Sequence, residues 1–231
     1  MMPKEHLNMD PISFHNALAK KWSIKYKKSG LRKRYKFFSA HLKPFIKKNS
    51  FWFDAGCGTG ILSRKINQYG AQVVAVDGSK EMIRMALKET EKNKRIKYIN
   101  SDLVNFDFES IKNFDGIICS SVIEYLDNPE TILMNFYNQL NKNGHLIFSV
   151  PNESSLVRNI QIALRNLFKC FKFSIFNYLQ ISKNSYTFRE LNDFLATFGF
   201  TDYKIYKFDA IIPDTLHKVF QPTLYVVFAK K

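Results

Sequence analysis

The sequence predicts an α/β fold: a doubly wound, mostly parallel seven-stranded sheet with helices on both faces. Two features of the 231-residue chain predict it. Between residues 49 and 153, short apolar runs alternate with helix-like segments, the order that gives βαβ units and a parallel sheet. After residue 190, a helix-like segment is followed by two β-like segments joined by a loop. These two segments are expected to form an antiparallel pair at one edge of the sheet.

The individual elements follow from periodicity and from helix-ending residues. The expected parallel strands are residues 51–54, 72–76, 96–99, 114–119 and 145–150, and the terminal pair is 203–208 and 224–229. Helices are expected at 61–69, at 79–91 with Ser79 as N-cap, at 128–140 and at 187–198. Gly70 and Gly199 end two of these helices, and Asn143-Gly144 predicts a turn.

A glycine-rich turn follows the first expected strand, with the sequence DAGCGTG at residues 54–60. Glycines let the backbone approach a ligand, and the free N–H groups at the next helix favour a negative group. A dinucleotide-binding turn is disfavoured because Ile61 occupies the third glycine position of the G-x-G-x-x-G pattern. A phosphate-binding P-loop is excluded because no Gly-Lys-Ser/Thr ends the turn.

The spacing Asp54-x-Gly56-x-Gly58-x-Gly60 resembles motif I of the Rossmann-like S-adenosylmethionine-dependent methyltransferases. The resemblance continues through LNKNGHLIFSVPN at 140–152 and SYTFRELNDFLATFGF at 185–200. Within that superfamily the chain looks most like the small-molecule enzymes, including the ubiquinone-pathway O-methyltransferases. The resemblance implies methyl transfer from S-adenosylmethionine to a small hydrophobic or anionic acceptor, at oxygen.

The resemblance also implies a set of cofactor-binding residues. Asp77 ends the second strand, where a carboxylate can accept both ribose hydroxyls. Asp102 would accept from the adenine amino group, although it could equally cap a short helix, and Met82 would pack on the adenine face. The complete expected set is Asp54, Gly56, Cys57, Gly58, Gly60, Asp77, Gly78, Met82, Asp102, Leu103, Ser120 and Tyr26.

The fourth strand ends near the expected acceptor site. Glu124 and Tyr125 follow it and are the candidate catalytic residues, with Glu124 as a base and Tyr125 as a base or a wall of the pocket. No metal is expected, because two of the three candidate ligands in the Glu-x-x-Glu-His motif of the ubiquinone branch are missing at 121–125. The Asn/Asp-Pro-Pro-Tyr/Phe motif of nucleic-acid amino methylases is also missing, and Cys119 is expected to be a buried thiol.

Charge and composition divide the expected single domain, residues 1–231, into four parts. Residues 1–48 are expected to form a basic helical lid, broken near Gly30, that brings Trp22 and Tyr26 over the methyl donor. Residues 49–153 are expected to form the cofactor-binding half. Residues 154–189 form a basic cap insertion, and 190–231 supply the last helix and strand pair. The net charge of +15 is concentrated in the lid and the cap, which favours an anionic partner.

Residues 154–181 have an amphipathic pattern. Four cations, Arg158, Arg165, Lys169 and Lys172, fall on one helical arc, with Leu156, Ile160 and Leu164 opposite. Such a helix could lie on an anionic membrane, cover a hydrophobic pocket, or pack on its own domain with the cations facing solvent. These alternatives remain open at the level of sequence.

Two other functions compete with small-molecule methylation. The basic, aromatic-containing N-terminus and pI of about 9.6 are compatible with an RNA methyltransferase. A non-catalytic protein that binds S-adenosylmethionine is the third reading. Three widely spaced cysteines and the lack of an apolar leader or spanning segment lead us to expect a cytoplasmic protein, with peripheral membrane association as the alternative.

Overall fold

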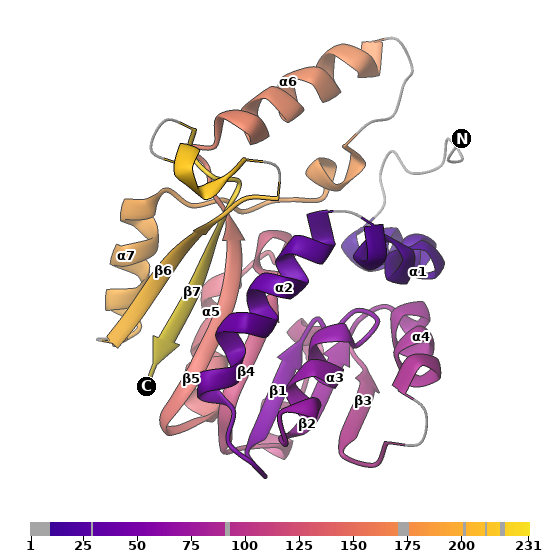
Figure 1. Ribbon diagram of the computed structural model, residues 1–231, viewed down its shortest axis with the longest axis vertical. Helices are drawn as coiled ribbons and strands as arrows, with labels where there is room; N and C mark the ends of the chain where they lie inside the picture. Colours follow the sequence, from indigo (N-terminus) through magenta and orange to yellow (C-terminus); the bar gives the residue numbers. More distant parts are fainter. Residues whose placement is uncertain are drawn as a thin grey trace.

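The computed structural model describes residues 10–28, 30–90, 93–170, 176–200, 202–210, 212–217 and 220–231. Seven strands form one sheet in the order β3-β2-β1-β4-β5-β7-β6 (Figure 1). The strands are β1 (Phe51–Ala55), β2 (Gln72–Asp77), β3 (Ile96–Asn100), β4 (Phe114–Ser120), β5 (Leu140–Pro151), β6 (Asp202–Phe208) and β7 (Leu224–Lys230). The first five are parallel, and β7 runs antiparallel to both β5 and β6. The predicted fold class is therefore confirmed.

Helices lie on both faces of this sheet. The α-helices are α1 (Pro11–Lys28), α2 (Gly30–Leu42), α3 (Ile61–Gln68), α4 (Lys80–Thr90), α5 (Pro129–Gln139), α6 (Leu156–Cys170) and α7 (Phe188–Thr197). Short 3-10 turns are η2 (Lys43–Phe45), η3 (Leu103–Asn105), η4 (Phe108–Ser110), η5 (Ile123–Tyr125), η6 (Asn177–Gln180) and η7 (Asp214–Leu216).

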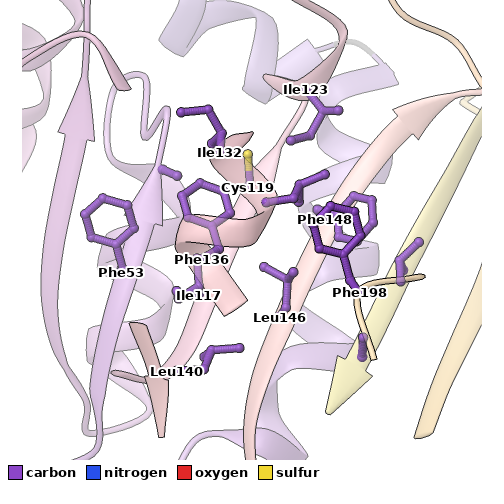
Figure 2. Close-up of a cluster of buried hydrophobic side chains, with 14 of the residues drawn as sticks. Phe53, Ile117, Cys119, Ile123, Ile132, Phe136, Leu140, Leu146, Phe148 and Phe198 are labelled. Carbon is purple, nitrogen blue, oxygen red and sulfur yellow. The ribbon is translucent and has the colours of Figure 1, made fainter. Parts of the chain in front are cut away.

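The alternation of side chains along the strands creates two cores. On one face, Trp52 and Ile118 pack with Phe38 of α2 and Ile66 of α3. On the other face, the core contains side chains of α5 and α7, and Figure 2 shows the part of it around Phe136 and Phe198. Because both faces of the sheet are covered, the middle of β4 (residues 117–119) and the second half of β5 (residues 146–148) are apolar and buried.

Local signals set most of the element boundaries. The Ser79 hydroxyl accepts from the Met82 amide at 3.1 Å and caps α4, as expected. Thr187 and Glu190 form a reciprocal capping box at the start of α7. Helix α2 begins at Gly30, where the sequence predicted a break. Close packing requires glycine here, because an added Cβ would lie 2.6 Å from Ala210 Cβ.

The predicted start of the fifth strand is wrong. The strand begins at Leu140, which pairs with Phe114, and a register irregularity follows before Gly116 pairs with His145. The expected turn is reduced to one left-handed residue, Asn143, with φ of 65°. The extended β5 is stabilised by the chain end, because the Asn143 amide donates to the Lys231 carbonyl.

From β1, strands β2 and β3 follow on one side of the sheet, and β4 and β5 lie on the other side. In open α/β sheets, ligands bind at the carboxyl ends of the strands where the strand order reverses in this way. Figure 1 shows α1 and α6 beyond the carboxyl ends of the parallel strands, at the same edge. Of the segments predicted as lid and cap, α1 and α6 lie at the ligand-binding edge. The second half of α2, also predicted as lid, instead packs on one face of the sheet, where Phe38 and Leu42 are fully buried.

Candidate active site

The glycine turn after β1 is held by the end of β2. The amides of Gly56 and Cys57 both donate to the Val76 carbonyl, at 2.8 and 3.0 Å. Gly56, Gly58 and Gly60 have φ values of 70°, 53° and 73°, the left-handed region that other residues avoid. At Gly56 the close neighbour is Val122, whose Cγ2 would lie 2.2 Å from an added Cβ. The turn therefore requires glycine both for its backbone and for contact with the loop after β4.

Asp77 connects the turn to the start of α4. One carboxylate oxygen accepts from the Gly58 amide and the other from the Ser79 amide, both at 2.8 Å. Burial raises the pKa of this carboxyl, and the two N–H donors oppose the shift. Each oxygen retains a lone pair, so the carboxylate can accept two further hydrogen bonds from a ligand.

Asp54, at the end of β1, is buried and accepts from the Ser63 hydroxyl at 2.5 Å. Burial raises its pKa to about 7, and the Asp77 charge adds to the shift. Cys57, in the turn itself, is also buried, and burial raises the pKa of its thiol. Cys119 is fully buried, as expected, and burial raises the pKa of its thiol, which disfavours the reactive thiolate.

A second group of predicted residues lies beyond Asp77. Met82 is 1% exposed and Leu103 4% exposed, and both line the same cavity as Gly78 and Asp102. Asp102 also caps η3, because its Oδ1 accepts from the Val104 amide at 3.1 Å. Capping and ligand binding are thus compatible at this residue, since a carboxylate has further acceptor capacity.

Helix α1 covers this region. The Asn16 side-chain oxygen accepts from the Ser79 hydroxyl at 2.6 Å and from the Glu81 amide at 3.1 Å, which fixes α1 to the start of α4. Trp22 and Tyr26 both line the cavity, and the Trp22 Nε1 atom lies 3.7 Å from a Cβ built on Gly58. Trp22 therefore lies next to the glycine turn, and Tyr26 lines the same cavity.

The loop after β4 presents the candidate catalytic residues. Ser121 is left-handed, with φ of 57°, and its amide donates to the Ser149 hydroxyl. The following turn is clamped by Asn184, whose side-chain amide donates to the carbonyls of Ile123 and Leu126 at 3.0 and 2.7 Å. The Glu124 carbonyl accepts from the amides at 183 and 184. This clamp fixes the positions of Glu124 and Tyr125.

The two candidate catalytic side chains are perturbed by burial. Glu124 is 5% exposed, and burial raises its pKa to about 7. Burial also raises the pKa of Tyr125, so its hydroxyl stays protonated at neutral pH. The Tyr125 ring lies 5.3 Å from the His15 ring of α1. A carboxyl that titrates near neutrality can take a proton from an acceptor, whereas this tyrosine is better suited to shaping the pocket.

A single cavity of about 1030 Å³ joins these groups. It is lined by every predicted site residue except Gly60, that is by Tyr26, Asp54, Gly56, Cys57, Gly58, Asp77, Gly78, Met82, Asp102, Leu103, Ser120, Glu124 and Tyr125. Gly60 instead begins α3, and an added Cβ would lie 2.2 Å from the Tyr98 hydroxyl. The volume reaches the upper end of the range of ~300–1,000 Å³ for small-molecule sites, which leaves room for two molecules.

Sequence reasoning missed several residues of this cavity. Arg34 of α2 lies in a lysine- and arginine-rich run where nothing marks it, yet its guanidinium donates to the Ser121 hydroxyl. Arg158 was expected on a cationic helical arc, but it lines the cavity and donates to the Ser182 hydroxyl at 2.7 Å. Lys183 lines the cavity and forms an ion pair with Asp127.

The cavity fits the cofactor implied by the resemblance. An added Cβ at Gly58 would meet only the Trp22 indole within 4 Å, so the turn leaves a cradle above its backbone. Asp77 offers acceptors for a pair of hydroxyls, while Met82 and Leu103 offer an apolar wall for a flat ring. Within the described residues, no group of three or more His, Cys, Asp or Glu is arranged to hold a metal ion.

Comparison of the sequence with known families gives one matching model. The model described as "Methyltransferase domain" matches residues 53–148. A ubiquinone biosynthesis O-methyltransferase of Schizosaccharomyces pombe is 32% identical over 115 residues, which cover 48% of this chain and 41% of that protein. One of Aliivibrio fischeri is 26% identical over 160 residues, which cover 65% and 67%. The chain thus spans about half the length, or less, of the first of these curated relatives.

Solved structures show the same fold. A SAM-dependent methyltransferase from Archaeoglobus fulgidus superposes with a TM-score of 0.65 at 20% identity, covering 91% of this chain and 99% of that one. Magnesium protoporphyrin IX methyltransferase from Synechocystis superposes with a TM-score of 0.70 at 16% identity, covering 95% and 97%. At these identities the structures support the fold, while the sequence match supports the family.

Proposed function

Because the chain belongs to the class I, Rossmann-like S-adenosylmethionine-dependent methyltransferases, we propose that it methylates a small acceptor at oxygen. The observation that carries the proposal is the shared cavity, in which the glycine turn and Asp77 lie at one part and Glu124 and Tyr125 at another. When bound, S-adenosylmethionine supplies an electrophilic methyl group on a sulfonium. The names of the matched ubiquinone O-methyltransferases support oxygen as the methylated atom.

Different residues that line the cavity have different roles in the proposed methyl transfer. Asp77 accepts the ribose hydroxyls, Asp102 accepts from the adenine amino group, and Met82 packs against the ring. Trp22 and Tyr26 exclude water from above the turn, which strengthens every electrostatic contact inside. Glu124 takes the proton of the acceptor hydroxyl, because its pKa of about 7 keeps a large fraction ionised at neutral pH while remaining basic enough to be a useful acceptor.

Calorimetric titration with S-adenosylhomocysteine tests the cofactor site. Asp77→Ala removes two charge-assisted hydrogen bonds to the ribose, so we expect affinity to fall at least about 100-fold. Asp193→Ala, which removes an exposed carboxylate from α7, is the matched control and should leave affinity unchanged. Transfer of labelled methyl into extractable small molecules then tests turnover. A folded wild-type protein that binds no cofactor would overturn the proposal.

An anionic membrane surface is the partner we propose for α6. The helix contacts its own domain through Arg158 and Gln161, which line the cavity, but none of its described side chains is fully buried. Leu156, Ile160, Leu164 and Leu167 are 48%, 48%, 37% and 56% exposed and share an arc of about 80°. Lys172 lies outside the described residues, as does the side chain of Lys169. Among the described residues no helix is long and apolar enough to cross a membrane.

Vesicle sedimentation tests this partner. Ile160→Asp with Leu164→Asp should abolish binding to phosphatidylglycerol vesicles, because it places charge on the apolar arc. Asn159→Asp with Asn166→Asp adds the same charge to the same helix outside that arc and should reduce binding far less. Equal binding of both double variants would rule out docking through the apolar face. RNA methylation, the alternative from the basic N-terminus, receives no support from the comparisons, and a salt-dependent gel shift would test it.

A further inference from the structure

The acceptor end of the cavity contains two arginines and one buried carboxyl from three separate segments. Arg34 comes from α2, Glu124 from η5 and Arg158 from α6, and all three line the cavity. Two of their buried polar atoms, Arg34 Nε and Glu124 Oε2, have no hydrogen-bond partner in the structure. Buried polar atoms without partners are rare and require an explanation, and a bound molecule supplies one.

The three groups do not satisfy one another. Among the described residues, the ion pairs within 4.0 Å include none between Glu124 and either arginine. The Arg34 guanidinium donates instead to the Ser121 hydroxyl, and that of Arg158 donates to the Ser182 hydroxyl. A guanidinium has five N–H donors, so each arginine has donors left for a ligand.

The local charge favours a monoanion. Two guanidinium groups face one carboxyl, whose pKa burial raises to about 7. Lys183, the other cation at this end, is already paired with Asp127. Burial also lowers the pKa of Arg158, which shows that its charge is poorly solvated. A ligand with one negative charge would leave this end of the cavity close to neutral.

We propose that Arg34 and Arg158 bind a carboxylate of the methyl acceptor. This inference rests on the proposed methyl transfer and names the class of its substrate. A planar carboxylate carries one negative charge and matches the fork of N–H donors of a guanidinium, which it can bind through both oxygens. The side chains of Tyr125 and Tyr178 line the same region and provide aromatic walls for the body of an aromatic acid. Arg34 and Arg158 are then specificity-determining residues, contributed by the lid and the cap.

Calorimetry with the S-adenosylhomocysteine-loaded protein tests the assignment. The probes are benzoate, phenylacetate, cinnamate and their 4-hydroxy forms, each paired with its neutral amide, together with phenyl phosphate. We expect at least one acid to bind the wild type at least 10-fold more tightly than its amide. Arg158→Gln should weaken binding of that acid about 10- to 100-fold, as expected for a lost hydrogen bond between charged groups, and Arg34→Gln should act similarly.

Matched variants separate this role from a merely structural one. Arg165→Gln removes the same charge from the same helix at a residue that does not line the cavity, so it should leave acid binding unchanged. Arg158→Lys keeps the charge but loses the fork, and it should bind acids with intermediate affinity. Amides that bind as well as acids, a preference for phenyl phosphate, no binding of any acid, or equal affinities in Arg158→Gln and wild type would each overturn the inference. Unchanged cofactor binding in those cases would leave the proposed function standing.

Discussion

Replacing Glu124 by glutamine is expected to stabilise the protein at pH 8 and to have little effect at pH 5. Glu124 is 5% exposed, and burial raises its pKa from 4.5 to about 7. The folded protein therefore holds this proton more tightly than the unfolded chain does. Stability linked to the proton is fully present below pH 4.5 and is lost as the pH rises through about 7.

The magnitude follows from the shift of the pKa. One pKa unit corresponds to about 1.36 kcal/mol, so the ionised side chain costs about 3 kcal/mol of the free energy of unfolding at pH 8. At pH 5 the same linkage gives less than about 1 kcal/mol. Glutamine has nearly the same shape and carries no charge, so it avoids this cost. For a chain of this size the gain corresponds to about 6–12 °C in Tm at pH 8.

Thermal unfolding followed by circular dichroism at pH 5 and pH 8 measures the effect, with the acceptor absent. Glu153→Gln, at an exposed position before α6, is the control and should leave the Tm nearly unchanged at both pH values. The other Asp and Glu residues titrate in both proteins, so their effects cancel in the difference in Tm between the variant and the wild type. If the gain from Glu124→Gln were the same at pH 5 and pH 8, the reasoning from burial of a charge would be refuted.

Substitutions at three further positions test the local geometry. Gly56→Ala should lower the free energy of unfolding by about 1–3 kcal/mol and weaken S-adenosylhomocysteine binding, because its Cβ would lie 2.2 Å from Val122 Cγ2; urea unfolding and calorimetry measure both. Gly116→Ala should cost about 1–3 kcal/mol in urea unfolding, because its Cβ would lie 2.5 Å from the buried Trp52 ring; a smaller loss would mean that the ring can move. Thr187→Ala should cost about 1 kcal/mol by losing the capping box of α7, while Thr187→Ser should restore most of it; equal Tm values for all three proteins would contradict the role of the cap.

The sheet could be predicted because each of its strands is marked locally. Apolar runs bounded by glycine, proline or polar turns fix where strands begin and end, and the alternation with helices fixes their parallel order. The failure at β5 has a physical cause. Residues 141–144 read Asn-Lys-Asn-Gly, a sequence typical of a turn, but the pairing of Leu140 with Phe114 and hydrogen bonds to Lys231 extend the strand through them. Those partners are 26 or more residues away and leave no mark in the local sequence.

The part of the cavity assigned to the cofactor could also be predicted, since its acidic residues lie at or just after the carboxyl ends of three adjacent strands. Asp54 and Asp77 lie within the last two residues of β1 and β2, Asp102 follows β3 by two residues, and parallel strands bring their carboxyl ends together. The residues at the acceptor end of the cavity are not marked by strand ends in this way. Arg34 meets Ser121 across 87 residues of sequence, and Arg158 meets Ser182 across 24. Only the path of α2 and α6 in space brings these side chains to one place.

The orientation of α6 shows why a helical wheel could not assign Arg158. A wheel separates the cations from Leu156, Ile160 and Leu164, but it does not say which side meets the protein. In the structure Arg158 lines the cavity while the three apolar side chains are exposed, the reverse of a helix with a cationic outer face. A partly buried guanidinium is costly unless it is paired, whereas exposed apolar side chains on one arc are a modest cost that a membrane surface removes. The two proposals for α6 therefore support each other: the same rotation of the helix that brings Arg158 to an acidic acceptor turns its apolar arc toward a lipid surface.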